Sequence, residues 1–73
     1  MKIADLENVL NYIRVHHYGV LADDADHLDV AFINTRGRRD VDIMVFDNSR
    51  YGTCRTFNFS ETLKELKNFQ ENA

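Results

Sequence analysis

The chain has 73 residues, of which 44% are hydrophobic and 29% charged, with a formal net charge of −3 and a single cysteine. This length allows one domain with a small core, because such a chain buries only about 60% of the surface that it exposes when unfolded. One cysteine excludes a disulfide framework, and no apolar run approaches the roughly 20 residues of a membrane span. The mildly acidic balance disfavours a general polyanion binder. We expect a cytoplasmic protein without a secretory leader, because residues 1–7 lack an uninterrupted apolar core.

The first predicted element is a helix over residues 3–17. Negative charge at Asp5 in the first turn and the two histidines His16 and His17 in the last turn both suit a helix dipole, and Gly19 suits the left-handed position that ends a helix. Adjacent histidines point about 100° apart on a helix, so they form a poor chelating pair and we expect no metal site there. The apolar stripe has three- and four-residue spacing and comprises Ile3, Leu6, Val9, Leu10 and Ile13.

An acidic connector follows at residues 22–29, with carboxylates at Asp23, Asp24 and Asp26. Clustered carboxylates raise the hypothesis of a divalent cation, but the spacing, central glycine and terminal glutamate of an EF-hand loop are missing. We therefore interpret the run as a solvated loop and expect neither a metal nor another cofactor. The connector also separates charge along the chain, because residues 21–30 carry −4 and residues 36–39 carry +3.

Three strands are predicted at residues 28–35, 40–47 and 52–59, joined by connections short enough to require antiparallel neighbours. Ser60 is the predicted N-cap of a second helix, whose apolar stripe consists of Leu63, Leu66 and Phe69. The expected fold class is a single α+β domain over residues 1–73. Its order is α-β-β-β-α, with two helices packed on one face of a three-stranded antiparallel sheet.

The predicted strands are apolar on both faces, which two helices on one face do not cover. Ile33, Met44 and Phe46 belong to the surplus face, together with Asp29 and Asp42, which argue for partial solvation. Two alternatives stay open: another molecule covers this face, or a shifted register or the acidic connector covers it from within. A flat patch with a methionine and an aromatic ring is typical of a protein-binding surface or a homodimer interface.

Two further features carry weaker signals. Arg36, Arg38 and Arg39 put three positive charges at one hairpin tip, which would grip phosphates or an acidic protein surface, or would simply be a solvated turn. Cys54 is interpreted as a small packed hydrophobe, because no glycine-flanked elbow or cysteine signature of a nucleophile surrounds it.

The α-β-β-β-α order on about 70 residues resembles the double-stranded RNA-binding domain in topology. That family clamps phosphates with a lysine cluster at the start of its last helix. Here the corresponding stretch reads Ser-Glu-Thr-Leu-Lys-Glu over residues 60–65, where Glu61 and Glu65 would repel a phosphate and only Lys64 and Lys67 are basic nearby. The proline of the family's central loop is also missing, because the chain has no proline.

The same architecture is similar to that of small phage-encoded inhibitors, including some anti-CRISPR proteins, by fold-level analogy only. The leading expectation is a non-enzymatic protein-binding module, an inhibitor or regulator, that binds a protein partner or a second copy of itself, with neither membrane nor nucleic acid as its target. The alternative is a nucleic-acid-binding domain of the double-stranded RNA-binding type. The predicted contact residues are Ile33, Met44 and Phe46, the tip residues Arg36, Arg38 and Arg39, and an acidic arm of Asp23, Asp24 and Asp26.

Overall fold

A computed structural model of the chain describes residues 2–34, 40–49 and 52–72. Its secondary structure confirms the predicted order α-β-β-β-α and the small α+β domain. The elements are α1 (Ile3–Tyr12), the π-helical turn η1 (Ile13–His17), the 3-10 helix η2 (Ala22–His27), β1 (Leu28–Ile33), β2 (Asp42–Asp47), β3 (Thr53–Asn58) and α2 (Phe59–Glu71). The predicted hairpin tip at residues 36–39 lies outside the described residues.

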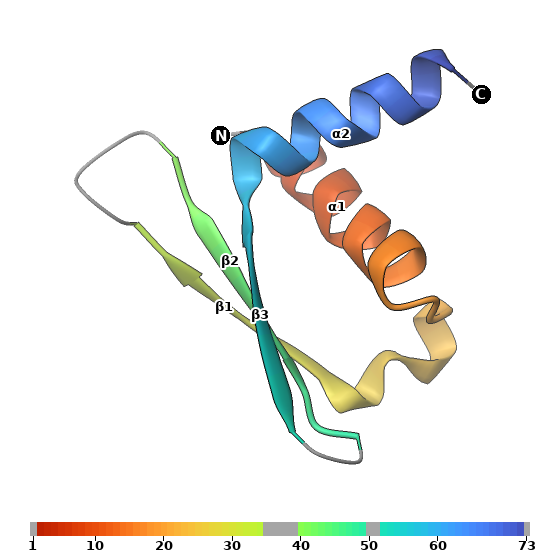
Figure 1. Ribbon diagram of the computed structural model, residues 1–73, viewed down its shortest axis with the longest axis vertical. Helices are drawn as coiled ribbons and strands as arrows, with labels where there is room; N and C mark the ends of the chain where they lie inside the picture. Colours follow the sequence, from red (N-terminus) through yellow and green to blue (C-terminus); the bar gives the residue numbers. More distant parts are fainter. Residues whose placement is uncertain (1, 35–39, 50–51, 73) are drawn as a thin grey trace.

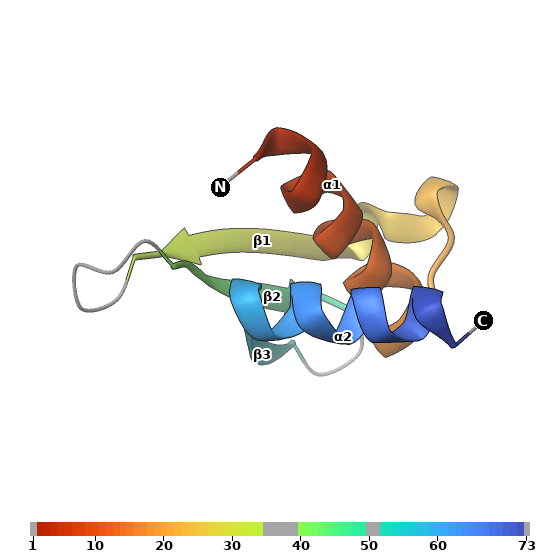
Figure 2. The ribbon, with the colours of Figure 1, turned by 90° about the horizontal axis from the view of Figure 1, so that it is seen from above.

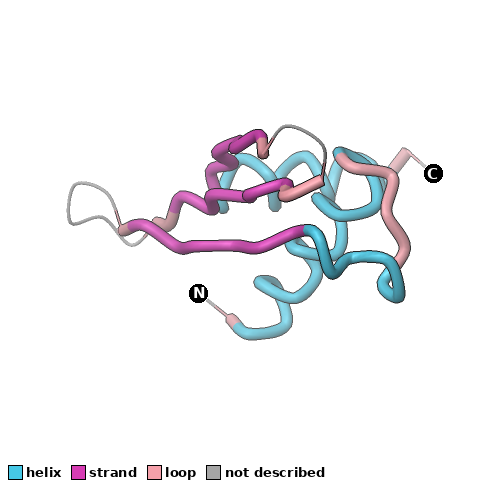
Figure 3. Tube along the Cα trace, turned by 90° about the horizontal axis from the view of Figure 1, so that it is seen from below, coloured by secondary structure: helices cyan, strands magenta, loops and turns pink. Residues whose placement is uncertain are grey.

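The three strands form an antiparallel sheet in the order β1-β2-β3, as predicted. Val30 of β1 lies opposite Val45 of β2, which in turn lies opposite Arg55 of β3. Side chains alternate between the two faces of a strand, so the buried Ile43 and Val45 mark the face that meets the helices. Both α1 and α2 lie on this one side of the sheet (Figure 1), and the strands run side by side in the view from below (Figure 3).

The core is a single small cluster between the central strand and the helices. It consists of Val9, Ile13, Ile43, Val45, Phe57 and Phe59, with Leu66 also buried on α2. Val9 of α1 and Ile43 of β2 are the most deeply buried side chains of this cluster, so the core lies between α1 and the central strand. Burial of apolar area in this cluster is the main stabilising contribution available to so short a chain.

The first helical segment spans residues 3–17 as predicted, but its last five residues form a π-helical turn. Gly19 then adopts a φ of 63°, the left-handed conformation expected of it, and its N–H donates to the carbonyl of Val15 at 3.0 Å. Arg14 Nη1 donates to the carbonyl of Val20 at 2.6 Å and so closes the turn that leads towards η2. The predicted connector at residues 22–29 is therefore not a simple loop, because residues 22–27 are helical and β1 begins at Leu28.

The predicted N-cap of α2 at Ser60 is wrong, because Asn58 caps this helix instead. Asn58 Oδ1 accepts a hydrogen bond from the N–H of Glu61 at 3.0 Å, while Asn58 Nδ2 donates to Asp40 Oδ2 at 2.9 Å. The helix begins immediately after β3, so Ser60 is already inside it, and its N–H donates to Asp40 Oδ1 at 3.3 Å. These donors, with the Asn58 amide as the largest contribution, lower the pKa of Asp40 below its ordinary value.

We expect Asn58→Ala to lower the free energy of unfolding by about 1–2 kcal/mol, because it removes a helix cap and the amide donor that Asp40 and Asp42 share. Asn68→Ala on the exposed surface of α2 is the matched control and should change stability by less than about 0.5 kcal/mol. Urea unfolding followed by circular dichroism measures both. Equal stability of the two variants would contradict the assigned cap.

Candidate functional site

The face of the sheet opposite the helices, called the outer face below, presents nine side chains in three rows. They are Asp29, Ala31 and Ile33 on β1, Asp42, Met44 and Phe46 on β2, and Cys54, Thr56 and Asn58 on β3. Phe46 lies between Asp29 and Cys54, and Met44 lies between Ala31 and Thr56. The structure therefore brings Ile33, Met44 and Phe46 onto one face.

The outer face is a mixed surface of apolar side chains and carboxylates. Ile33 is 39% exposed, and Met44 and Phe46 are half-buried by their neighbours within the sheet. Neither α1 nor α2 covers them, because both helices lie on the other side of the sheet (Figure 1). Asp29 accepts a hydrogen bond from Asn48 Nδ2 at 2.6 Å, which holds one carboxylate beside Phe46. The role of these side chains as partner contacts stays a prediction.

The helix-packed face is also incompletely covered, which the sequence pattern did not indicate. Val30 and Phe32, on the helix side of β1, remain 45% and 48% exposed. The reason is where the helices sit. α2 packs against β3 and α1, whereas α1 crosses the sheet and its amino-terminal end extends past β1 in the views from above and from below (Figures 2 and 3), so a groove is left between α1 and β1. Alternation identifies the face of a side chain, but it does not say how far a helix extends across that face.

An apolar groove of 390 Å³ lies between α1 and β1 as a result. Its lining is mainly apolar and comprises Leu10, Ile13, Ala25, Leu28, Val30 and Val45, with Glu7, Asn11 and Arg14 as its polar members. It has the size of a small ligand site and is open to solvent.

The structure describes the predicted acidic arm but not the predicted arginine tip. Asp23, Asp24 and Asp26 are exposed on η2, next to the start of β1. Arg36, Arg38 and Arg39 lie outside the described residues. Within the described parts of the chain, no group of three or more histidine, cysteine, aspartate and glutamate side chains is arranged to hold a metal ion.

Cys54 is exposed on the outer face and is not the packed hydrophobe that we expected. The physical reason is its position on β3, an edge strand, on the face that no helix covers.

The junction of the two helices contains a polar cluster that sequence reasoning missed. Glu65 of α2 accepts a hydrogen bond from the hydroxyl of Tyr12, and its Oε2 lies 2.8 Å from His17 Nε2. His17 makes the largest contribution to lowering the pKa of Glu65 below its ordinary value of 4.5. Burial and the bond to Glu65 raise the pKa of Tyr12. Glu65 is 53 residues from Tyr12 and 48 residues from His17 in the chain. Only the packing of α2 against α1 and η1 therefore brings the carboxylate to these two side chains.

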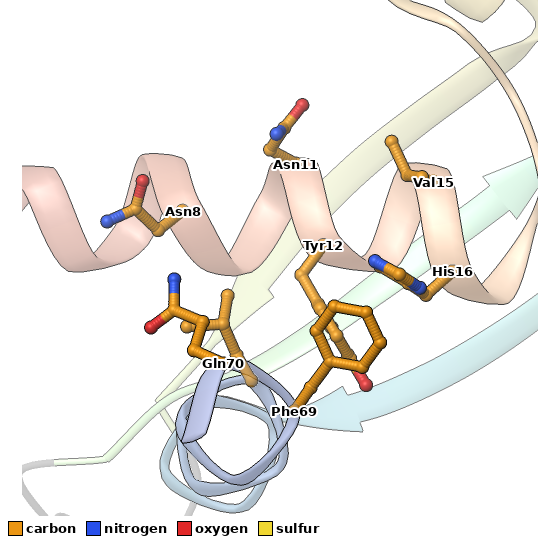
Figure 4. Close-up of a pocket in the computed structure, with 8 residues that line it drawn as sticks. Asn8, Asn11, Tyr12, Val15, His16, Phe69 and Gln70 are labelled. Carbon is orange, nitrogen blue, oxygen red and sulfur yellow. The ribbon is translucent and has the colours of Figure 1, made fainter. Parts of the chain in front are cut away.

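Next to this cluster, aromatic rings line a shallow pocket of 210 Å³ between α1 and α2 (Figure 4). The His16 ring stacks on Tyr12 with centroids 4.6 Å apart and meets Phe69 edge-on at 4.4 Å. Asn8, Asn11 and Gln70 supply amide groups at its rim. These contacts join the helices, and the pocket contains neither a thiol nor a carboxylate among its lining residues.

The surface of α2 carries both signs of charge. Lys64 and Lys67 are exposed, but so are Glu61 and Glu65 on the same helix. A phosphate backbone that approached this surface would meet carboxylates as well as ammonium groups, which weakens the electrostatic attraction that duplex binding requires.

The chain matches no protein-family model, no curated protein and no solved structure. No relative therefore indicates an activity, a ligand or a partner. None of the helices in the described ranges has both the length and the apolar character needed to cross a bilayer.

The lowered pKa of Glu65 predicts an acid-dependent loss of stability. A group whose pKa is lower in the folded than in the unfolded state stabilises the fold above its unfolded pKa, and this contribution is lost as the pH falls through the folded pKa. Glu65→Gln should therefore show a smaller loss of unfolding free energy than the unsubstituted protein between about pH 7 and pH 3. The Glu65→Gln variant should still lose some stability in acid, because the pKa values of Asp40 and Asp47 are also lowered in the folded state.

Urea midpoints across this range measure the effect. Glu71→Gln, at the exposed end of the same helix, is the control and should follow the unsubstituted protein. If Glu65→Gln loses as much stability in acid as the control does, the bonds from His17 and Tyr12 do not stabilise the fold in the way described.

Proposed function

We propose that the protein is a non-enzymatic protein-binding module, an inhibitor or regulator that binds a larger protein through its outer face. The observation that supports this most directly is an apolar patch of Ile33, Met44 and Phe46 that runs across a sheet face left uncovered by α1 and α2 (Figure 1). Soluble domains seldom expose such a patch without a use for it, and methionine and aromatic side chains are enriched in protein interfaces. The exposed free thiol of Cys54 is compatible with action in the cytoplasm.

The charges around the patch define the partner's chemistry. Asp29 and Asp42 belong to the same face, and the exposed carboxylates of η2 adjoin the start of β1. A complementary surface would be apolar at its centre and would carry lysine or arginine side chains at its rim. Such charge pairs at a rim speed association and select the partner, while the apolar centre supplies most of the affinity.

The main alternative, binding of double-stranded RNA, has the chain topology and the exposed Lys64 and Lys67 in its favour. Glu61 and Glu65 beside these lysines, together with the net charge of −3, favour a protein partner instead.

The substitution Phe46→Lys tests the proposal. It removes the aromatic ring from the central strand of the outer face and places a positive charge opposite Asp29, so the strand pairing is retained while a partner with a basic rim is repelled. We expect a specific partner, purified after capture by the unsubstituted protein, to lose at least about 30-fold in affinity, as for a central interface residue. Ile3→Lys, an equivalent change at a side chain that is 77% exposed on α1, should bind normally.

Titration calorimetry with the purified partner gives the affinities, and circular dichroism checks the folding of each variant. If Phe46→Lys unfolds, the milder variant Met44→Gln takes its place. Binding of Met44→Gln with the affinity of the unsubstituted protein would then show that the outer face is not the contact surface. Salt-sensitive retention on duplex RNA, with no protein captured, would replace the proposal with its alternative.

A further inference from the structure

We propose that the free edge of β1 and the overhanging end of α1 together bind an extended segment of another protein, which adds to the sheet as a fourth strand. The segment has apolar side chains at alternate positions, followed by lysine or arginine. This inference goes beyond the proposed function, because it uses the edge and the helix side of β1, whereas the larger protein of the proposed function would contact the outer face.

The backbone of β1 presents hydrogen-bonding groups along its free edge. The N–H of Asn48 donates to the carbonyl of His27 at 2.8 Å, which identifies a hydrogen-bonded pair of the β1–β2 ladder. Bonded pairs alternate along an antiparallel ladder, so every second residue from His27 directs its backbone groups towards β2 and the residues between them direct theirs outwards. The N–H groups and carbonyls of Val30 and Phe32 therefore point away from the sheet. Neither a proline nor a lysine interrupts β1.

The amino-terminal end of α1 lies above the position that a fourth strand would occupy. It projects past β1, on the side away from β2 and β3, in the views from above and from below (Figures 2 and 3). Figure 1 shows α1 in a layer beside the strands and not in line with the sheet. Neighbouring strands are about 4.8 Å apart, so a strand added to β1 would run beneath the overhanging turns of α1. The helix thus covers this strand position without filling it.

The apolar stripe of α1 continues onto the overhang, where none of the described strands lies beneath it. Leu6 and Leu10 pack against the core, so the side of α1 that they share faces the sheet. Ile3 lies on the same side, one turn before Leu6, yet it is 77% exposed. An added strand would place apolar side chains between Ile3 and the half-exposed Val30 and Phe32 of β1, and would bury all three.

The direction of the backbone groups sets the sequence pattern of the segment. Residues that face each other in a bonded pair have side chains on the same side of the sheet. Segment residues opposite Leu28, Val30 and Phe32 therefore point to the helix side, where the groove is lined by apolar side chains. Apolar residues are expected at these three alternate positions, and polar residues between them. Leu28 contributes its carbonyl alone, because its N–H is bonded to the carbonyl of Ala25.

The overhang selects an extended segment over a second copy of the chain. Two-fold pairing along β1 would bring the α1 helices of the two copies into the same space, because each helix overhangs the strand position that the other copy would occupy (Figures 2 and 3). A segment without a helix of its own meets no such obstacle. A small apolar molecule would use the groove but not the backbone groups of β1, whereas a strand uses both.

The charges around the groove favour a basic end on the segment. Glu7 at the rim of the groove is exposed, and so are three carboxylates of η2 that precede β1. Lys2 at the N-cap of α1 and Arg14 oppose them, but Arg14 already donates to the carbonyl of Val20 at 2.6 Å. In an antiparallel addition, the more stable arrangement, the carboxyl-terminal end of the segment lies beside the start of β1. A lysine or arginine at that end would meet the η2 carboxylates, which are Asp23, Asp24 and Asp26.

Titration with a synthetic peptide, followed by nuclear magnetic resonance, tests the added strand. The probe is an acetylated octapeptide amide in which three threonines alternate with three valines and two lysines follow the last valine. We expect saturable shifts of the amide signals of Val30 and Phe32, and slower hydrogen exchange at both N–H groups because they become bonded. The same peptide with both lysines moved to its amino-terminal end should bind about threefold more weakly, because its charges then lie away from η2.

Backbone methylation of the probe supplies the matched control. A methyl group on the nitrogen of the second valine removes a hydrogen bond to β1 and should weaken binding at least about tenfold. The same change at the next threonine, whose N–H points to solvent, should leave the affinity within about threefold.

The variant Val30→Lys should also weaken binding of the unmodified probe at least about tenfold, because it places a charge in the apolar groove. Val30 is 45% exposed, so this variant is expected to fold, as circular dichroism would verify. Met44→Gln on the outer face should bind the probe normally, which separates this inference from the proposed function.

Three results of the titration would overturn the proposal: no saturable shifts up to about 2 mM probe, shifts confined to the outer face, or equal weakening by the two methyl groups. Sedimentation equilibrium of the protein alone completes the test. A dimer in which the amides of Val30 and Phe32 are protected from exchange would assign the edge of β1 to a second copy instead.

Discussion

The packing of α1 and α2 onto the central strand is the constraint on which the rest of the structure depends. Val9 and Ile13 bury Ile43 and Val45, and Phe57 and Phe59 extend the same cluster towards β3. The described residues form one such cluster, and the two helices leave Val30 and Phe32 of β1 about half exposed. The core and the exposed surfaces therefore have one cause: the helices cover Ile43 and Val45 of β2 fully, but they leave the more distal Val30 and Phe32 of β1 exposed.

Polar contacts determine how the helices are oriented over this core. Asn58 caps α2 and binds Asp40 and Asp42, so the helix leaves β3 in a defined direction. Glu65 then links α2 to α1 through His17 and Tyr12. β1 is an edge strand of the sheet, and with α2 above β3 and α1 crossing β1, a groove remains on its helix side (Figure 2). The same few hydrogen bonds that stabilise the helix layer thus decide which surface remains for binding.

The sequence by itself determined the elements and the faces of the strands. Helical spacing from Ile3 to Ile13, the glycine at position 19 and the short connections between apolar strands are local properties, so they predicted the order α-β-β-β-α. Because successive side chains of a strand point to opposite faces, the sequence also placed Met44 and Phe46 on the other face of β2 from Ile43 and Val45. Only the tertiary structure decided the cap at Asn58, the cluster around Glu65 and the exposure of Val30 and Phe32. Each of these depends on where a helix lies across the sheet, and that position follows from contacts between residues far apart in the chain, which no periodicity along the chain records.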